Sequence, residues 1–250
     1  MKVFLAGNAP WVEKGLYDDL FEKYSPYMLS SYYFRDGVVE RREFFGDFIL
    51  DSGAFSAMQG KSQKGKSWEE YAESYAVFVK ERGIEKYIEL DLDDVIGLEK
   101  TKALTRRIEA IVGSPCIPVW HEARGRRGFE EMCEQYSYVA FGGIASSFKQ
   151  DVRVKYERAF PWFIRTAHRY GSKIHGLGYT PLGGLRKFHF DSVDSSSWLC
   201  GRWGDVCIYK HGDIEVIRRP ERKRVSSMRD IMRHNFEQWC LYQKYADEKL

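Results

Sequence analysis

The stretch Phe48–Phe55 reads FILDSGAF, and it places Asp51 directly after an apolar run that is typical of a buried strand. The small residues behind Asp51, beginning with Ser52, let the backbone turn out of the strand. A second stretch, Phe188–Ser195, reads FHFDSVDS and predicts the same arrangement around Asp191. Each carboxylate is therefore expected at the C-terminal end of a strand, where a parallel α/β barrel collects its catalytic groups. Two such carboxylates suit an acid/base or a nucleophile/base pair.

Strand-like and helix-like segments alternate along the chain, which predicts a parallel sheet. The strand-like runs are Lys2–Ala6, Phe48–Leu50, Lys86–Leu92, Cys116–Trp120, Tyr138–Phe141, Lys173–Leu177, Phe188–Val193 and Val206–Lys210. The helix-like segments are Ser67–Lys80, Leu98–Ile111, Asp151–Arg169 and Ser226–Asp247, and the loops include Gln63–Lys66 and Gly125–Gly128. We expect an α/β fold, a TIM-type (β/α)8 barrel with a C-terminal helical extension. One domain is expected over residues 1–250, in which 218–250 form a basic segment and the last helix.

The composition predicts a soluble protein with reduced cysteines. Charged residues make up 30% of the 250 residues, and no apolar run is long enough to cross a bilayer, so no membrane partner is expected. The apolar stretch behind Lys2 is too short for a signal peptide. The cysteines are odd in number and scattered, with no CxxC pair: Cys116, Cys133, Cys200, Cys207 and Cys240. A cytoplasmic location follows as the expectation.

Positive charge is clustered, although the formal net charge is only +3. One cluster is formed by Arg124, Arg126 and Arg127, and a second by Arg218, Arg219, Arg222, Lys223 and Arg224. Either cluster alone is explained by a solvated charged face. Two clusters beside a catalytic face favour a phosphate-rich partner, because arginines neutralise phosphates.

Two further strand ends carry residues suited to binding. Asp91 lies in the acidic stretch Ile88–Asp94, which reads IELDLDD, and Gly142 and Gly143 follow the run Tyr138–Phe141. A buried aspartate costs free energy unless it is paired or used. For Asp93, Asp94 and Asp194, a helix N-cap or a surface loop is the simpler interpretation. The two glycines lack side chains, so a planar ligand can approach their backbone closely.

In their order, these segments resemble the tRNA-guanine transglycosylase superfamily. Residues 51–55 resemble the family's Asp-Ser-Gly-Gly-Phe/Tyr loop, and residues 190–193 resemble its Phe-Asp-Cys/Ser-Val/Ala segment. Residues 138–144 resemble the strand whose Gly-Gly backbone meets the base, and residues 174–181 resemble the Leu-Met-Gly-Val-Gly-x-Pro loop. Asp91 falls where the family has a base-reading aspartate. The five motifs cover residues 48 to 195.

The resemblance implies a role for each matched residue. Asp191 is expected to be the nucleophile and Asp51 the acid/base, with Asp91 accepting hydrogen bonds from N1–H and the 2-amino group of guanine. The other residues expected to contact the substrate are Ser52, Phe55, His121, His175, Gly142 and Gly143. Phe55 is expected to stack on the base, although a core phenylalanine fits the same pattern. His121 stands where the tRNA enzymes place a base-contacting glutamine, and His175 where they often have methionine; a core or rim histidine is the alternative for both.

The chain departs from the tRNA enzymes at their zinc site. It has no Cys-x-Cys-x-x-Cys triplet, and His234 and Asn235 match only the family's His-Asn pair. Cys200, Cys207 and His211 follow no zinc-binding spacing. We therefore expect no metal and no other cofactor. The missing zinc module, the short chain and the continuation Val193–Trp198 resemble the DNA-modifying branch, found in phages and bacteria, which exchanges guanine in DNA for a 7-deazaguanine.

The predicted activity is therefore a base exchange through a covalent glycosyl-aspartate, with DNA and a base such as 7-cyano-7-deazaguanine as partners. Such chemistry parallels the retaining glycosidases, in which one carboxylate attacks and the other exchanges protons. The target base must leave its stack to react. The alternatives are a tRNA-guanine transglycosylase without zinc, and a non-catalytic nucleic-acid-binding protein on the same barrel. A barrel lyase or aldolase would want a Schiff-base lysine or metal ligands, which the strand ends do not clearly offer.

Overall fold

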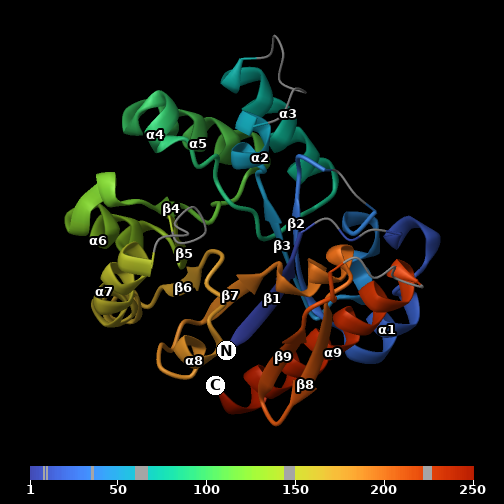
Figure 1. Ribbon diagram of the computed structural model, residues 1–250. Helices are drawn as coiled ribbons and strands as arrows, with labels where there is room; N and C mark the ends of the chain where they lie inside the picture. The colour runs from blue at the N-terminus through green and yellow to red at the C-terminus, as the bar shows by residue number, and fades with distance from the viewer. Residues whose placement is uncertain (8, 10, 35–36, 60–66, 144–149, 222–226) are drawn as a thin grey trace. The chain divides into compact units, whose positions relative to one another are not determined.

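The computed structural model describes residues 1–7, 9, 11–34, 37–59, 67–143, 150–221 and 227–250 (Figure 1). Contacts divide the chain into two compact units. The first unit comprises Met1–Ser30, Asp36–Phe48 and Gly178–Leu250, and the second comprises Ser31–Arg35 and Ile49–Leu177. Both units consist of parallel strands joined through helices, so the α/β class is confirmed.

The first unit contains three parallel strands with β1 in the middle. The strands are β1 (Lys2–Ala6), β2 (Tyr27–Ser31) and β7 (Ser192–Ser195); Leu5 of β1 lies opposite Met28 of β2, and Lys2 lies opposite Ser192 of β7. The helices of this unit are α1 (Asp18–Tyr24), α8 (Leu182–Leu185) and α9 (Met228–Lys249), with 3-10 turns at Val12–Lys14, Val39–Phe44 and Ser197–Trp203. Helix α9 packs on β1, and its buried Gln243 amide donates to the carbonyls of Val3 at 2.6 Å and Tyr27 at 2.7 Å.

An antiparallel hairpin accounts for the strand predicted at Val206–Lys210. Its bounds are confirmed as β8, but β8 pairs with β9 (Asp213–Ile217) in a separate two-stranded sheet. His211 and Gly212 form the turn with φ values of 48° and 83°, the left-handed pair that a tight hairpin requires. The prediction that this run belongs to the barrel was wrong: the two-residue turn directs the chain straight back, so β8 pairs with β9 in an antiparallel hairpin outside the parallel sheet.

The second unit contains β4 (Val119–Trp120), β5 (Tyr138–Phe141) and β6 (Lys173–Gly176) in that order, all parallel. Phe141 of β5 lies opposite Trp120 on one side and Gly176 on the other. Strand β3 (Asp47–Asp51) begins in the first unit and ends in the second. The helices are α2 (Ala54–Gln59), α3 (Trp68–Glu81), α4 (Asp93–Ile96), α5 (Leu98–Val112), α6 (Gly125–Gln135) and α7 (Gln150–Arg169), of which α6 and α7 lie side by side (Figure 1).

A strand-like segment links β3 to the start of β4. The strand predicted at Lys86–Leu92 is reduced to single bridges, from Tyr87 to Leu50 and from Ile88 to Ile117, both parallel. Backbone hydrogen bonds of 2.8–3.1 Å support these bridges. The described residues therefore contain seven parallel strands, one fewer than the predicted barrel.

Local sequence signals set several element ends. The helix predicted at Ser67–Lys80 is confirmed as α3, and Ser67 and Glu70 form the capping box at its start, with bonds of 3.2 Å and 2.9 Å. The predicted loop Gly125–Gly128 is wrong, because it forms the first turn of α6. The predicted loop Gln63–Lys66 lies outside the described residues. No helix in the described part of the chain is both long and apolar enough to cross a membrane.

We predict that alanine at Gly53 destabilises the protein more than alanine at Gly113. Both glycines have positive φ, 69° and 90°, which costs an alanine about 1–2 kcal/mol. A Cβ at Gly53 would also lie 2.6 Å from Ser31 Oγ and 2.6 Å from Tyr33 Cβ, whereas Gly113 faces open space. Urea unfolding should show an additional loss of roughly 1–3 kcal/mol for Gly53→Ala. Equal losses in the two variants would contradict the close packing at Gly53.

Candidate functional site

Asp51 is held at the C-terminal end of β3, as the sequence predicted. Its Oδ2 accepts the Gly53 N–H at 2.9 Å, and its carbonyl accepts the Tyr32 N–H at 2.9 Å. The next residue, Ser52, is buried, and its carbonyl accepts the Tyr71 hydroxyl of α3 at 2.7 Å. Hydrogen bonds from Tyr32 and Tyr71 therefore fix the turn that carries the Asp51 carboxylate. The buried Ser52 side chain does not form part of an exposed surface.

Phe55 lies on the outer side of α2. It is 60% exposed, so the alternative of a core phenylalanine is excluded. Met58, one turn further along α2, is also exposed. An exposed aromatic ring four residues after Asp51 is available for stacking on a ligand.

Asp91 and His121 form the closest charged contact among the predicted site residues. His121 Nε2 lies 2.5 Å from Asp91 Oδ1, in the geometry of an ion pair rather than an aligned hydrogen bond. Burial lowers the pKa of His121, but the contact with Asp91 and the charges of Asp91 and Asp93 raise it more, so the net shift is upward. The pair therefore favours the imidazolium form of His121 beside the carboxylate.

The His121 ring lies against Gly142 at the end of β5. A Cβ on Gly142 would meet His121 Nε2 and Cε1 at 2.7 Å, so only glycine fits beneath this ring. Gly143 has a φ of 79°, and a Cβ there would lie 3.2 Å from the Tyr156 hydroxyl of α7. The two glycines thus allow His121 and Tyr156 to approach the backbone. The sequence predicted the need for a close approach, but it assigned that need to a bound base alone.

His175 occupies a different position from the other predicted contacts. It lies within β6 opposite Ala140 and is completely buried. Its ring packs edge-on to Tyr138 with 6.4 Å between the centroids. The structure thus places His175 in the core, as the simpler interpretation of this histidine had it.

Asp191 does not follow a strand, contrary to the prediction. Strand β7 begins one residue later, and the carbonyl of Asp191 accepts the N–H of Lys2, the first residue of β1, at 3.0 Å. The apolar residues that suggested a strand, Phe188 and Phe190, are instead buried beside Tyr179. Their ring centroids lie 6.2 Å and 6.0 Å from that of Tyr179. Asp191 therefore lies at the N-terminal end of β7.

Asp194 is the carboxylate near the C-terminal end of the same strand. It is the penultimate residue of β7 and lies opposite Phe4 of β1. Its Oδ1 accepts the Gly178 N–H at 2.6 Å, and 8% of the residue is exposed. The interpretation of Asp194 as a helix cap or a surface residue is therefore wrong.

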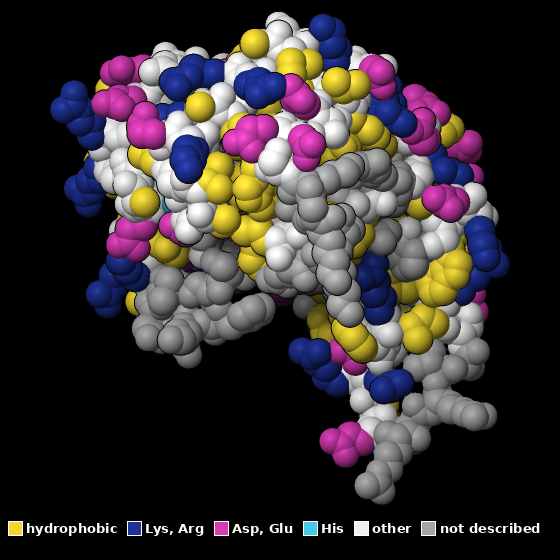
Figure 2. All heavy atoms as spheres, turned by 90° about the horizontal axis from the view of Figure 1, so that it is seen from above, with side chains coloured by type: hydrophobic (Ala, Val, Ile, Leu, Met, Phe, Trp, Pro, Cys, Tyr) yellow, Lys and Arg dark blue, Asp and Glu magenta, His cyan; other side chains and the backbone are white. Residues whose placement is uncertain are grey.

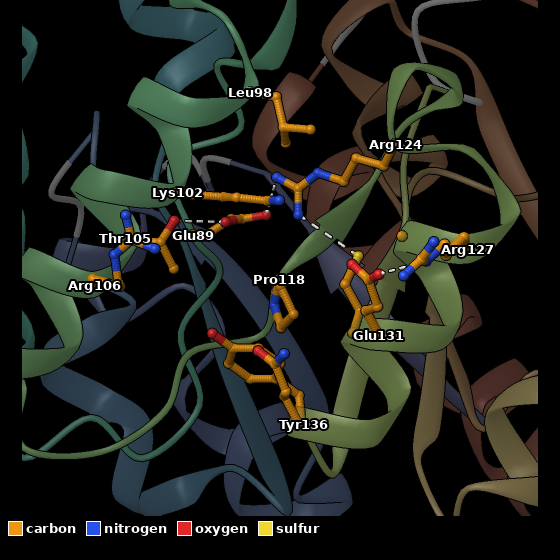
Figure 3. Close-up of a pocket in the computed structure, with 13 residues that line it drawn as sticks. Glu89, Leu98, Lys102, Thr105, Arg106, Pro118, Arg124, Arg127, Glu131 and Tyr136 are labelled. Carbon is orange, nitrogen blue, oxygen red and sulfur yellow. Dashed lines mark hydrogen bonds and ion pairs between the residues drawn. The ribbon is translucent and has the colours of Figure 1, made fainter.

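Arg124 belongs to a buried ion cluster rather than to a phosphate-binding surface. Its Nη2 lies 2.8 Å from Glu89 Oε1 (Figure 3). Its Nε lies 2.5 Å from Asp93 Oδ2, and its side chain is only 5% exposed. Burial raises the pKa of Glu89, opposed by Arg124 and by hydrogen bonds from Thr105 and the Val119 N–H. The cluster joins the 86–89 segment to α4 and β4, so the assignment of Arg124 to phosphate binding is corrected.

The remaining arginines of the two clusters differ in their surroundings. The Arg126 guanidinium lies 4.9 Å from the Trp162 ring, and Arg127 is 92% exposed beside Glu131. Arg218 is exposed and bonds Asp205 at 2.8 Å, and Asp205 also accepts the Arg219 N–H. Arg222 and Arg224 lie outside the described residues. On the face in Figure 2, Lys and Arg side chains are interleaved with Asp and Glu.

A cavity of about 440 Å³ lies between α5 and α6 (Figure 3). Its lining residues are Glu89, Leu98, Lys102, Thr105, Arg106, Pro118, Arg124, Arg127, Gly128, Glu131, Met132, Gln135 and Tyr136. The predicted base-contacting residues are not among them. Its charged side chains include the Arg124–Glu89 and Arg127–Glu131 pairs, so much of its charge is neutralised internally.

The described residues contain no group of three or more His, Cys, Asp or Glu side chains arranged to hold a metal ion. The His-Asn pair of α9 binds the hairpin instead. His234 Nε2 lies 2.9 Å from the Cys207 carbonyl, and Asn235 Oδ1 accepts the Cys207 N–H at 2.8 Å. These two side chains therefore fix β8 to α9.

We predict a pH-dependent contribution of the Asp91–His121 pair to stability. Because the folded pKa of His121 is raised, the contribution is fully present below its ordinary pKa of about 6.5 and is lost as pH rises through the raised value. His121→Gln should cost about 1 kcal/mol near pH 5.5 and less near pH 9, measured by urea unfolding. In an Asp91→Asn background this pH trend should disappear. The same trend in both backgrounds would contradict the pairing.

We also predict that Arg124 and Arg127 differ in how much their substitution destabilises the protein. Arg124→Met leaves the buried Glu89 and Asp93 carboxylates without their cation and should cost about 3–5 kcal/mol in unfolding free energy. The matched variant Arg127→Met removes an exposed charge and should cost less than about 1 kcal/mol. Thermal and urea unfolding of both variants provide the measurement. A small effect of Arg124→Met would show that the cluster is not buried in solution.

Sequence reasoning missed two residues that shape this region, Glu89 and Tyr156. Glu89 could have been suspected as a lone acidic residue inside the apolar run before Asp91, while Tyr156 gives no signal because tyrosines in helices are common.

The ends of parallel segments of the second unit carry most of the predicted site residues, namely Asp51, Asp91, His121, Gly142 and Gly143. No protein-family model matches this chain, and no curated protein matches it.

Proposed function

We propose that this protein is a transglycosylase that exchanges guanine in DNA for a 7-deazaguanine base. The observation that carries the proposal is the row of residues following consecutive parallel segments of the second unit: Asp51, Asp91, His121, Gly142 and Gly143. Catalytic and binding groups of parallel α/β enzymes gather at such strand ends. The ordered resemblance to the guanine transglycosylases points to the same residues.

The proposal includes a closed (β/α)8 barrel. In the second unit, the end of β3, the 86–89 segment, β4, β5 and β6 are five parallel segments, joined in this order. In the first unit, β1, β2 and β7 are three more. Five and three add up to the eight that such a barrel requires.

The Asp91–His121 pair suits a guanine edge. A carboxylate accepts hydrogen bonds from N1–H and the 2-amino group together, a pair of donors that adenine and pyrimidines do not present. A protonated His121 supplies a donor beside it, and the glycine backbone at 142–143 allows a flat ring to approach. Because Asp91 Oδ1 already contacts His121, base binding must share or displace this contact. The exposed Phe55 is proposed to stack on the nucleotide.

The proposed reaction is a double displacement at C1′ of the nucleotide. A carboxylate oxygen bonds to C1′ while the C1′–N9 bond breaks, and its electron pair leaves with guanine, which takes a proton at N9 from Asp51. N9 of the incoming base then attacks C1′, the ester bond breaks, its electron pair returns to the carboxylate, and Asp51 takes the N9 proton. Atoms and electrons balance over the two steps without a redox cofactor.

DNA is the proposed polymer, and tRNA is the alternative. The sequence lacks the cysteine triplet of the tRNA enzymes, and residues 193–198 continue as in the DNA branch. Arg126, Arg127, Arg218 and Arg219 are proposed to contact phosphates, since each places at least part of its side chain in solvent. A phosphate-binding role for Arg222 and Arg224 remains part of the proposal.

The test offers equal amounts of guanine-containing DNA and unmodified tRNA together with 7-cyano-7-deazaguanine. Mass spectrometry of the digested nucleosides should find the deazaguanine in DNA. Asp91→Asn removes an acceptor and should lower the exchange rate roughly tenfold or more. The matched variant Asp94→Asn, at an exposed position nearby, should exchange at the wild-type rate. Deazaguanine found only in tRNA would reject the DNA assignment, and its absence from both would reject the transglycosylase.

A further inference from the structure

We infer that Asp194, and not Asp191, is the nucleophile of the proposed base exchange. This inference rests on the proposed function and changes the residue that the sequence resemblance assigns. The two aspartates lie three residues apart: Asp191 directly precedes β7, and Asp194 is its penultimate residue. Only one of these ends belongs to the edge at which a parallel α/β enzyme performs its chemistry.

The register of β7 decides between them. Lys2, Val3, Phe4 and Leu5 of β1 lie opposite Ser192, Val193, Asp194 and Ser195, so both strands run toward the same edge. Asp191 precedes the first paired residue, and its carbonyl is bound by the N–H of Lys2. Asp194 is the third of the four paired residues of β7. Asp191 is therefore at the N-terminal edge and Asp194 at the C-terminal edge.

The surroundings of Asp194 form a fixed support for a reacting group. Its Oδ1 accepts the N–H of Gly178, a residue with a φ of 68°, at 2.6 Å. Behind it, Ser195 Oγ accepts the Ser197 N–H at 3.2 Å, and Trp198 Nε1 donates to the carbonyl of Ala6, the last residue of β1, at 2.9 Å. The chain leaving β7 is thus tied to the end of β1, which limits the movement of the carboxylate.

The same device holds the proposed acid/base. Asp51 ends β3, and its Oδ2 accepts the N–H of Gly53, whose φ is 69°. Both carboxylates therefore belong to residues near the C-terminal end of a strand, and each accepts a backbone N–H from a glycine in the left-handed conformation. Asp194 is a buried residue, with 8% of its surface exposed. In its chemical role, one Asp194 oxygen forms the ester to C1′ as the C1′–N9 bond breaks, and the electron pair returns to it when the second base attacks.

The experiment traps the intermediate on the wild-type protein. The enzyme is mixed with a guanine-containing DNA oligonucleotide without an incoming base, and hydroxylamine converts any glycosyl-aspartate ester into an aspartyl hydroxamate. Tryptic cleavage after Lys187 and Arg202 gives one peptide that contains both aspartates, and fragment ions at Ser192 and Val193 separate them. We expect the hydroxamate on Asp194. A hydroxamate on Asp191 overturns the inference and leaves the transglycosylase standing.

Matched amide variants give an independent readout. Asp194→Asn keeps an oxygen acceptor for Gly178. It should lower the rate of base exchange by on the order of 1000-fold or more, as expected when a nucleophile is lost. Asp191→Asn should retain exchange within about tenfold of the wild type by the same reasoning. Loss in Asp191→Asn with exchange kept in Asp194→Asn overturns the inference. If the wild-type protein forms neither adduct nor exchanged base on DNA or tRNA, the proposed function itself fails, and the assignment of Asp194 fails with it.

Discussion

The buried carboxylate of Glu89 is the contact on which the described site depends. It accepts hydrogen bonds from the Val119 N–H at 2.6 Å and the Thr105 hydroxyl at 2.7 Å, and it forms an ion pair with Arg124 Nη2 at 2.8 Å. The 86–89 segment has only single bridges to its neighbours, so these side-chain contacts supplement a weak backbone ladder. Because Arg124 also binds Asp93, the cluster orders both ends of the stretch that carries Asp91. A buried charge is tolerated here because three partners satisfy it.

Glycines are the second constraint, because two of them adopt the left-handed conformation and a third leaves room for a side chain. Gly53 and Gly178 each present an N–H to a carboxylate at a strand end, and Gly142 admits the His121 ring. A side chain at Gly53 or Gly142 would enter occupied space. The glycines thus serve the protein's own packing first. Any ligand that approaches the backbone there must fit beside His121 rather than over an empty glycine surface.

A site residue was placed correctly where the sequence signal for it is local, and wrongly where its position depends on distant residues. Asp51 was placed correctly because the strand before it and the turn after it are both encoded locally. Asp191 was misplaced because Phe188 and Phe190, which read as a strand, are buried by packing on Tyr179. Arg124 was misassigned because a charged cluster in the sequence does not reveal that its carboxylate partners lie about 30 residues earlier and are buried with it.

The sequence by itself determined the α/β class, the ends of β1 and β5, the capping box of α3 and the strand-end position of Asp51. Each of these depends on apolar periodicity or on hydrogen bonds between residues a few positions apart. Tertiary structure decided that β8 turns back in a hairpin, that β7 begins after Asp191, and that Asp91 meets His121. These features depend on pairing and burial between distant residues. The free energy of such contacts is set by neighbours that no local pattern specifies.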